Sequence, residues 1–154
     1  MQIRKTFKAE TAHRVADAYT TRCRGLHGHS YEFEIILKDT NLNNCGMVLD
    51  FKLVKEKINA LLDAFDHSLL IWDKDEFLVK NAKELNERYM IVPYNPTAEL
   101  MALHIYKHIK KMYDVDSVIV HETRTGYAKY SGEDINKDID LDKVFISEAI
   151  LNEI

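Results

Sequence analysis

Three histidines and one cysteine near the N-terminus have the types and the spacing of a catalytic metal site. His27 and His29 are separated by one glycine, and His13 and Cys23 precede this pair. Because a β-strand turns alternate side chains to the same face, His27 and His29 point the same way in a strand. Two imidazoles on one face and a third from a neighbouring strand make a three-nitrogen site. Zinc held by three protein ligands keeps its fourth position open, which is typical of catalytic rather than structural zinc.

Cys23 lies shortly before His27, where a thiol can act on whatever the metal binds. Arg22 and Arg24 flank it, and positive charge beside a thiol favours the reactive thiolate. The alternatives are ordinary ones: a single His-x-His pair is more often a coincidence of surface residues, and Cys23 could be a passive loop thiol. For Cys45, in a polar turn, the passive interpretation is the better one.

Three further residues could take part in chemistry. Asp66 and His67 follow a predicted helix, as either a simple charge pair or a histidine that an acid orients for proton transfer. Glu122 shares its side of a predicted strand with Val118 and Val120. Unless the strand frays there at a solvent edge, its carboxylate points inward and needs a partner with two N–H donors.

A second histidine pair competes for the role of metal site. His104 and His108 are one helical turn apart, but they flank an apolar stripe and lack the glutamate of a metalloprotease helix. We therefore expect them to be part of ordinary helix packing. Sequential strands are usually neighbours, so convergence favours zinc at His13, His27 and His29.

The composition is that of a soluble globular protein. Of the 154 residues, 46% are apolar and 30% charged, with a net charge of −4. No basic block is present, which argues against nucleic acid as a partner. No apolar run is long enough to span a membrane, and the N-terminus does not resemble a signal peptide. We expect a cytoplasmic protein with reduced cysteines, folded as a single domain over residues 1–154, in which residues 131–154 form an acidic C-terminal extension.

Alternating apolar and polar residues predict strands that carry the histidines. The four predicted strands span residues 5–13, 30–38, 117–125 and 127–130. His13 shares the face of Phe7 in the first strand, and His27 and His29 continue the apolar face of the second. The histidines are therefore expected at the mouth of the face that forms the core.

Two amphipathic helices are predicted between these strand pairs. The first covers residues 51–65 after the N-cap Asp50. The second begins with Asn95 as its cap and Pro96 in its first turn, and ends near residue 112.

The order of elements predicts an α+β fold. It is an antiparallel four-stranded sheet with two helices on one face, interrupted by an inserted segment at residues 74–94 in which residues 77–85 are weakly helical. Because such a sheet leaves two open edges, we expect a closed homo-oligomer that pairs them.

These residues together resemble the 6-pyruvoyltetrahydropterin synthase family, and in particular its bacterial branch, the 6-carboxytetrahydropterin synthases of queuosine biosynthesis. The matching pieces follow the family's order across residues 1–130. They are Ala12-His13, Cys23-x-x-x-His27-Gly28-His29-x-Tyr31, Leu49-Asp50-Phe51, Asp66-His67-x-Leu69, Asn95-Pro96-Thr97-Ala98-Glu99 and Glu122-Thr123-x-Thr125. The spacing from Cys23 to His27 resembles the carboxy branch, whereas the pyruvoyl branch has a longer gap. Two departures are a longer segment between His67 and Asn95 and a tail without counterpart in the short bacterial members.

The resemblance implies the tunnelling fold, ββααββ, in which sheets of several subunits close into a barrel with active sites between subunits. The expected homo-oligomer is a hexamer. It also implies Zn²⁺ bound by His13, His27 and His29, and 7,8-dihydroneopterin triphosphate as the substrate. The zinc would bind the side-chain hydroxyls of this substrate and act as a Lewis acid.

The resemblance assigns roles to the remaining residues as well. It implies that Cys23 is the general base and that Asp66 and His67 relay protons. Glu122 would grip the amino and ring N–H groups of the pterin and also join the proton relay as a catalytic residue. Further pterin contacts are expected at Thr97 and Thr123. The products would be triphosphate, acetaldehyde and 6-carboxy-5,6,7,8-tetrahydropterin.

Two other functions compete with this one. The same scaffold could stop at 6-pyruvoyltetrahydropterin, before any carbon–carbon cleavage. Alternatively, the chain could be a non-catalytic zinc-binding or pterin-binding module. Cys23 together with Asp66 and His67 argues against the second alternative, because a binding protein needs neither a base nor a proton relay.

Overall fold

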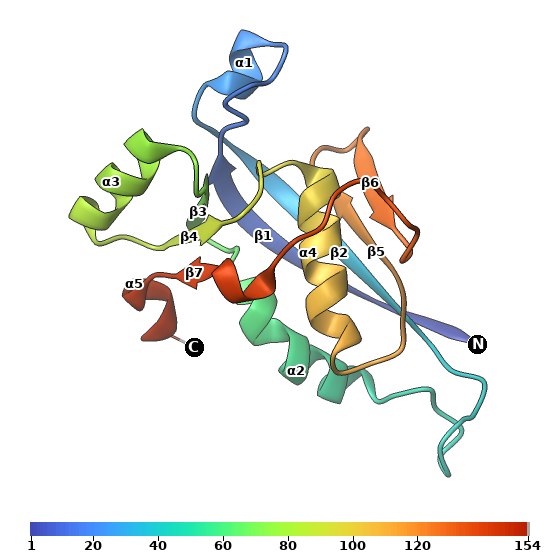
Figure 1. Cartoon of the computed structure of the whole chain (residues 1–154). Helices are drawn as coiled ribbons and strands as arrows, with labels where there is room; N and C mark the ends of the chain where they lie inside the picture. Colours follow the sequence, from blue (N-terminus) through green and yellow to red (C-terminus); the bar gives the residue numbers. More distant parts are fainter. Residues whose placement is uncertain (154) are drawn as a thin grey trace.

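The computed structural model describes residues 1–153, which form one seven-stranded sheet with helices packed against it (Figure 1). The strands are β1 (Gln2–His13), β2 (His27–Lys38), β3 (Ser68–Trp72), β4 (Tyr89–Val92), β5 (Val115–His121), β6 (Tyr127–Tyr130) and β7 (Phe145–Ile146). The helices are α1 (Thr21–Arg24), α2 (Phe51–Asp63), α3 (Glu76–Leu85), α4 (Ala98–Lys110), the 3₁₀ turn η1 (Leu141–Lys143) and α5 (Glu148–Leu151).

The sheet has the order β6-β5-β2-β1-β3-β4-β7 and is mixed. The first four strands of this order are antiparallel and correspond to the four predicted strands. On the other side of β1, β3 runs parallel to β1 and β4 runs parallel to β3, and β7 closes the sheet antiparallel to β4. The prediction of a four-stranded antiparallel sheet is therefore wrong.

The strands β3 and β4 were not predicted because their sequences do not alternate between apolar and polar residues. All four residues of β4 are buried, and β3 is buried or half-buried throughout. Strands covered on both faces are continuously apolar and do not alternate. The helix between them, α3, confirms the weak helical pattern of residues 77–85, and it provides the crossover that two parallel strands need.

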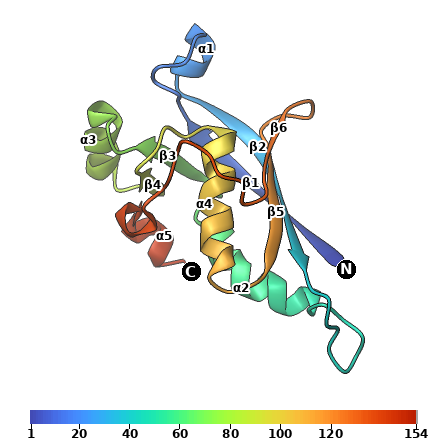
Figure 2. The same ribbon diagram turned by 45° about the vertical axis from the view of Figure 1, so that its right-hand side comes forward.

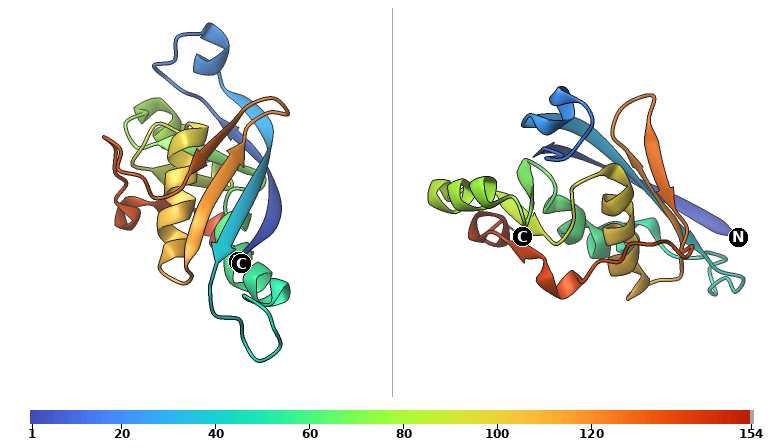
Figure 3. Two further views of the ribbon diagram at one scale, coloured as in Figure 1. Left: turned by 90° about the vertical axis from the view of Figure 1, so that its right-hand side faces the viewer. Right: turned by 45° about the horizontal axis from the view of Figure 1, so that its top comes forward.

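The helices α2 and α4 pack against one face of β1, β2 and β5, as expected. Figure 3 shows α4 lying along this face of the sheet. Their shared core contains Phe33, Ile58, Phe65, Met101 and Ile105. The apolar positions of both helices recur every three to four residues, which directs them to this face.

Helix starts follow side-chain capping. The Asp50 carboxylate accepts hydrogen bonds from the backbone N–H of Lys52 and Leu53, so this cap of α2 was predicted correctly. The cap of α4 is Thr97 rather than the predicted Asn95, because the Thr97 hydroxyl accepts from Leu100 N.

Two further predictions, for Asn95 beside α4 and Phe51 in α2, are wrong. The Asn95 side chain donates to the Asp17 carboxylate instead of capping α4, and this contact joins the loop after β1 to the start of the helix. Phe51, expected in the apolar stripe of α2, is the first residue of the helix and is 50% exposed, so the buried stripe begins at Val54.

The C-terminal segment, residues 131–153, packs against the rest of the domain. Ile139 and Ile150 are buried in the main core, and Ser147 exchanges hydrogen bonds with the backbone of Tyr89 at 3.0 and 3.1 Å. Consequently α5 lies at the same end of the molecule as α3 (Figure 2). Among residues 1–153, no helix has the length and apolar character that a membrane crossing requires.

Candidate metal centre and active site

The β1–β2 ladder brings the three predicted histidines together. His13 lies opposite His27 in the register and Thr11 lies opposite His29, so all three imidazoles project from the same face. Their ring centroids are 4.7 to 5.3 Å apart. One ligand nitrogen from each ring lies within 4.8 Å of the other two. Within residues 1–153 this is the one group of three metal-ligating side chains that meets this distance.

Backbone carbonyls orient two of these rings. Nδ1 of His13 donates to the carbonyl of Pro96, and Nδ1 of His27 donates to that of Gly25, each at 2.7 Å. In both rings Nε2 is therefore the nitrogen that can bind a metal. Burial lowers the pKa of His13 and of His29, which favours the neutral, metal-binding imidazole. Three such nitrogens fit a zinc ion with one open position.

Glu122 faces the histidines, as its parity in the strand predicted. It follows β5 directly, and its Oε1 lies 3.7 Å from Nε2 of both His13 and His29. The hydroxyl of Tyr31 donates to the same oxygen at 3.4 Å. Burial and the Glu122 charge raise the pKa of Tyr31, so this phenol stays protonated. Sequence reasoning did not assign Tyr31 to the site, although it shares the face of His27 and His29.

Cys23 shares a pocket with Glu122. This 330 Å³ pocket is lined by Cys23, Thr97, Glu122 and Tyr127, among others. Cys23 belongs to the short helix α1, which stands at the ends of β1 and β2 in Figure 1, and its side chain is exposed. The hydrogen bond from Val15 N to the Cys23 carbonyl at 2.8 Å closes the loop that carries it. The chain thus places a thiol and a carboxylate in one pocket.

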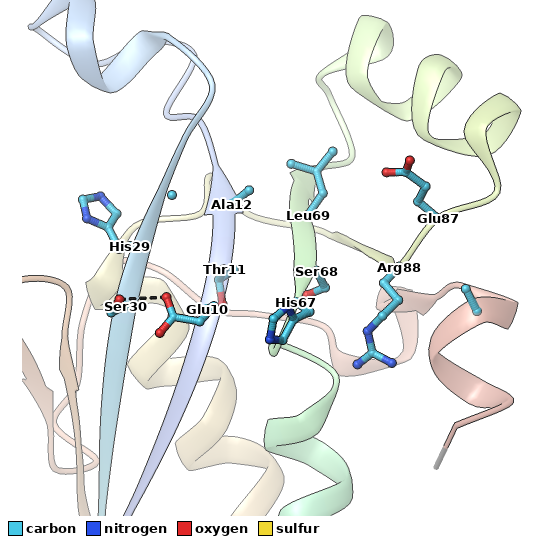
Figure 4. Close-up of a pocket in the computed structure, with 12 residues that line it drawn as sticks. Glu10, Thr11, Ala12, His29, Ser30, His67, Ser68, Leu69, Glu87 and Arg88 are labelled. Carbon is cyan, nitrogen blue, oxygen red and sulfur yellow. Dashed lines mark hydrogen bonds between the residues drawn. The ribbon is translucent and has the colours of Figure 1, made fainter.

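Asp66 and His67 lie elsewhere on the chain. The exposed His67 lines a second, larger pocket of 730 Å³ together with Glu10, Ser30 and Arg88. In Figure 4, β1 and β2 are drawn between the His67 ring and the ring of His29. His29 lines this larger pocket as well, but not the pocket of Cys23 and Glu122, and Asp66 lines neither of the two.

The remaining candidates have structural partners. The Thr123 hydroxyl accepts from Gly126 N at 3.1 Å and so closes the turn between β5 and β6. His104 is hydrogen-bonded to Tyr94 at 2.8 Å in the core, and burial lowers its pKa to about 3. It is therefore a neutral core residue. Cys45 is exposed in the turn after β2, where its backbone N–H donates to Asn43.

A sequence model described as 6-pyruvoyl tetrahydropterin synthase matches residues 2–133, most of the chain. The chain belongs to the 6-pyruvoyl tetrahydropterin synthase family. Among curated relatives, the 6-carboxy-5,6,7,8-tetrahydropterin synthase of Helicobacter pylori strain J99 is 32% identical over 143 residues, covering 84% of this chain and 72% of that protein. The enzyme of the same name from Aquifex aeolicus is 31% identical, covering 86% and 98%.

Solved structures agree with this family fold. The 6-pyruvoyl tetrahydropterin synthase of Caenorhabditis elegans superposes with a TM-score of 0.66 at 22% identity, covering 86% of this chain and 96% of that one. An uncharacterised Wolinella succinogenes protein gives 0.73 at 23% identity, covering 86% and 98%. This member of the family carries β7 and α5 beyond the residues that the family match covers.

Proposed function

We propose that this enzyme is a zinc-dependent lyase of queuosine biosynthesis, acting in the cytoplasm. With one water it converts 7,8-dihydroneopterin triphosphate to 6-carboxy-5,6,7,8-tetrahydropterin, with release of triphosphate and acetaldehyde. The observation that carries the proposal is the convergence of His13, His27 and His29 with Glu122, which also lines the pocket of Cys23. The names of the bacterial relatives support the carboxy product.

The residues divide the work as follows. His13, His27 and His29 hold the zinc, which when bound supplies a Lewis acid for the hydroxyls of the substrate side chain. Cys23 as the thiolate removes the carbon-bound proton beside the pterin ring. Glu122 accepts hydrogen bonds from the amino and ring N–H groups of the pterin.

The contact between Glu122 and the two histidine nitrogens has a natural place in this scheme. Glu122 also lines the pocket that contains Thr97, so with zinc on the histidine nitrogens its carboxylate would serve the ligand in that pocket instead of the imidazoles. Thr97 and Thr123 are the further pterin contacts of the proposal. The Thr97 hydroxyl retains its own hydrogen for a ligand while its oxygen caps α4.

In this proposal Asp66 and His67 act in the active site of a neighbouring subunit. Residues 2–10 of β1 pair with β2 on one side, whereas β3 adjoins β1 only at residues 11–13. At the end of the described sheet opposite β7, the outer side of β6 is a second open edge. Pairing these edges between copies covers both of them. We propose a homo-oligomer, a hexamer, in which Asp66 and His67 of one copy complete the active site of the next as its proton relay, while the three histidines of that copy hold the zinc.

Products of the wild-type enzyme test the reaction. Incubation of the zinc-loaded protein with 7,8-dihydroneopterin triphosphate should release triphosphate and acetaldehyde in equal amounts with the carboxypterin. Triphosphate without acetaldehyde would instead identify 6-pyruvoyltetrahydropterin as the product, the reaction named for the family as a whole. Tight pterin binding without either product would indicate a non-catalytic binding module instead.

A further inference from the structure

The turn between α2 and β3 holds His67 in an unusual backbone conformation. Its φ is 47°, in the left-handed region that residues other than glycine rarely adopt. The surrounding chain must therefore hold this turn in place, since a histidine here does not keep that conformation by itself. Part of the support comes from Asp66, whose Oδ1 accepts from Glu10 N at 2.8 Å.

Arg88 supplies the largest set of contacts to this turn. Its Nη2 donates to the carbonyl oxygens of Asp63 at 2.8 Å and of Asp66 at 3.0 Å, and its Nε donates to Asp66 O at 3.2 Å. The side chain is only 15% exposed. A planar guanidinium holds its donors in a rigid fork and so fixes two carbonyls relative to one another, whereas the three donors of an ammonium group rotate. Arg88 therefore connects the last turn of α2 to the residue before His67.

The C-terminal segment in turn orients Arg88. Glu153 Oε2 accepts from Nη1 of Arg88 at 2.6 Å. Glu153 is brought there by β7 and α5, which are anchored through Ser147 on the Tyr89 backbone and through buried Ile150. These anchors and Glu153 lie beyond residue 133, outside the family match.

We propose that Arg88, oriented by Glu153, is a positioning residue that sets the direction of the His67 imidazole for proton transfer. This rests on the proposed function, in which His67 relays protons. Four of the five N–H bonds of Arg88 are directed at the protein. A role in gripping the substrate's phosphates is the alternative, and it requires these hydrogen bonds to break.

Hydrogen exchange of the zinc-loaded protein without substrate tests whether Arg88 holds the turn that carries His67. Arg88→Ala should speed exchange of the Asp66 and Glu10 amides at least tenfold and leave the β2 amides unchanged. Arg88→Lys, which keeps the charge near Glu153, should give an intermediate effect. Unchanged exchange at both amides in a folded Arg88→Ala protein overturns the proposal, whatever the activity.

A double-mutant cycle tests the catalytic half. Arg88→Ala should lower kcat about tenfold with KM and zinc content unchanged, and it should cause no further loss in a His67→Ala background, because it acts through His67. An equal loss in both backgrounds, or a rise in KM alone, overturns the proposal. Wild-type turnover in His67→Ala would instead show that the proposed relay is wrong.

The exposed residue Glu153 gives a milder variant if Arg88→Ala does not fold. Glu153→Gln should lower kcat about threefold in the wild-type background and not at all in His67→Ala. The matched control is Glu148→Gln, an exposed acid on α5, which should keep full activity. Equal activities of Glu153→Gln and Glu148→Gln would remove Glu153 from the proposal.

Discussion

The carbonyl oxygen of Pro96 accepts a hydrogen bond from Nδ1 of His13 at 2.7 Å, although the two residues are 83 positions apart. This contact joins a histidine of β1 to the residue just before the cap of α4. It fixes the tautomer of the ring and directs Nε2 towards His27 and His29. Because the acceptor is a backbone oxygen, the direction of this ligand depends on how α4 begins.

We predict about one zinc ion per chain, held by the three histidines. His27→Ala or His29→Ala should each lose the metal, since two imidazoles leave too few ligands. Metal analysis of the purified proteins measures this. His67→Ala, which changes a residue outside the histidine cluster, is the control and should retain zinc. Undiminished zinc in both ligand variants would contradict the assignment.

The metal site was predictable because it follows from local rules. Alternation in β1 and β2 fixes the side on which His13, His27 and His29 lie, and the antiparallel register then brings them together. The side-chain cap at Asp50 is equally local. By contrast, the fully buried β4 carries no periodic signal, because α3 covers one of its faces and the main core the other, while β7 pairs with its edge.

Other parts of the site depend on contacts between distant residues. No sequence pattern predicts the hydrogen bond from His13 to the Pro96 carbonyl, or those from Arg88 to the carbonyls of Asp63 and Asp66. The separation of His67 from the histidine cluster is also a tertiary fact, because the β3 strand beside β1 determines it.

Replacing the proposed base should separate catalysis from binding. Cys23→Ala should keep its zinc and still bind dihydroneopterin triphosphate, because the three histidines and Glu122 remain. Its turnover should fall roughly a hundredfold or more, the usual scale for removing a positioned base. Steady-state kinetics and a direct binding assay measure the two effects. Cys45→Ala should behave as the wild type; an active Cys23→Ala enzyme would eliminate the thiol from the mechanism.

Glu122→Ala should weaken pterin binding rather than the metal site. The paired N–H groups of the pterin would then face an empty slot, which costs about 1–3 kcal/mol or roughly a tenfold to hundredfold loss in affinity. Calorimetry with the pterin on zinc-loaded protein measures it. Glu32→Gln, on the opposite face of β2, is the matched control. Loss of zinc in Glu122→Ala, with pterin affinity intact, would make Glu122 part of the metal site instead.

The open edges predict an assembly larger than a dimer. Light scattering at micromolar concentration should give a homo-oligomer, because residues 2–10 of β1 and the outer side of β6 otherwise stay unpaired. A proline at Lys8 should weaken the assembly if the outward side of β1 pairs between copies. A fully active monomer would contradict the shared active site.

The ion pair of Arg14 with Asp75 predicts how stability changes with pH. Nε and Nη2 of Arg14 donate to the two carboxylate oxygens at 2.6 and 2.7 Å, and Asp75 also caps α3. The hydrogen bonds from Arg14 lower the pKa of Asp75 below its ordinary value, against the opposing effect of burial. Because the folded state favours the carboxylate, its stabilisation is present above the unfolded pKa near 4 and is lost as pH falls through the folded value.

Asp75→Asn should therefore cost about 2 kcal/mol of unfolding free energy at pH 7 and much less at pH 3, where wild-type Asp75 loses its charge. Urea unfolding of the metal-free proteins at both pH values measures the difference, so that zinc release does not contribute. Asparagine still caps a helix, so the lost ion pair dominates the change. Asp73→Asn, an exposed neighbour, should show a small cost at either pH. If the cost of Asp75→Asn were the same at pH 3 and pH 7, the charge of Asp75 would not be what stabilises this junction of β1 and α3.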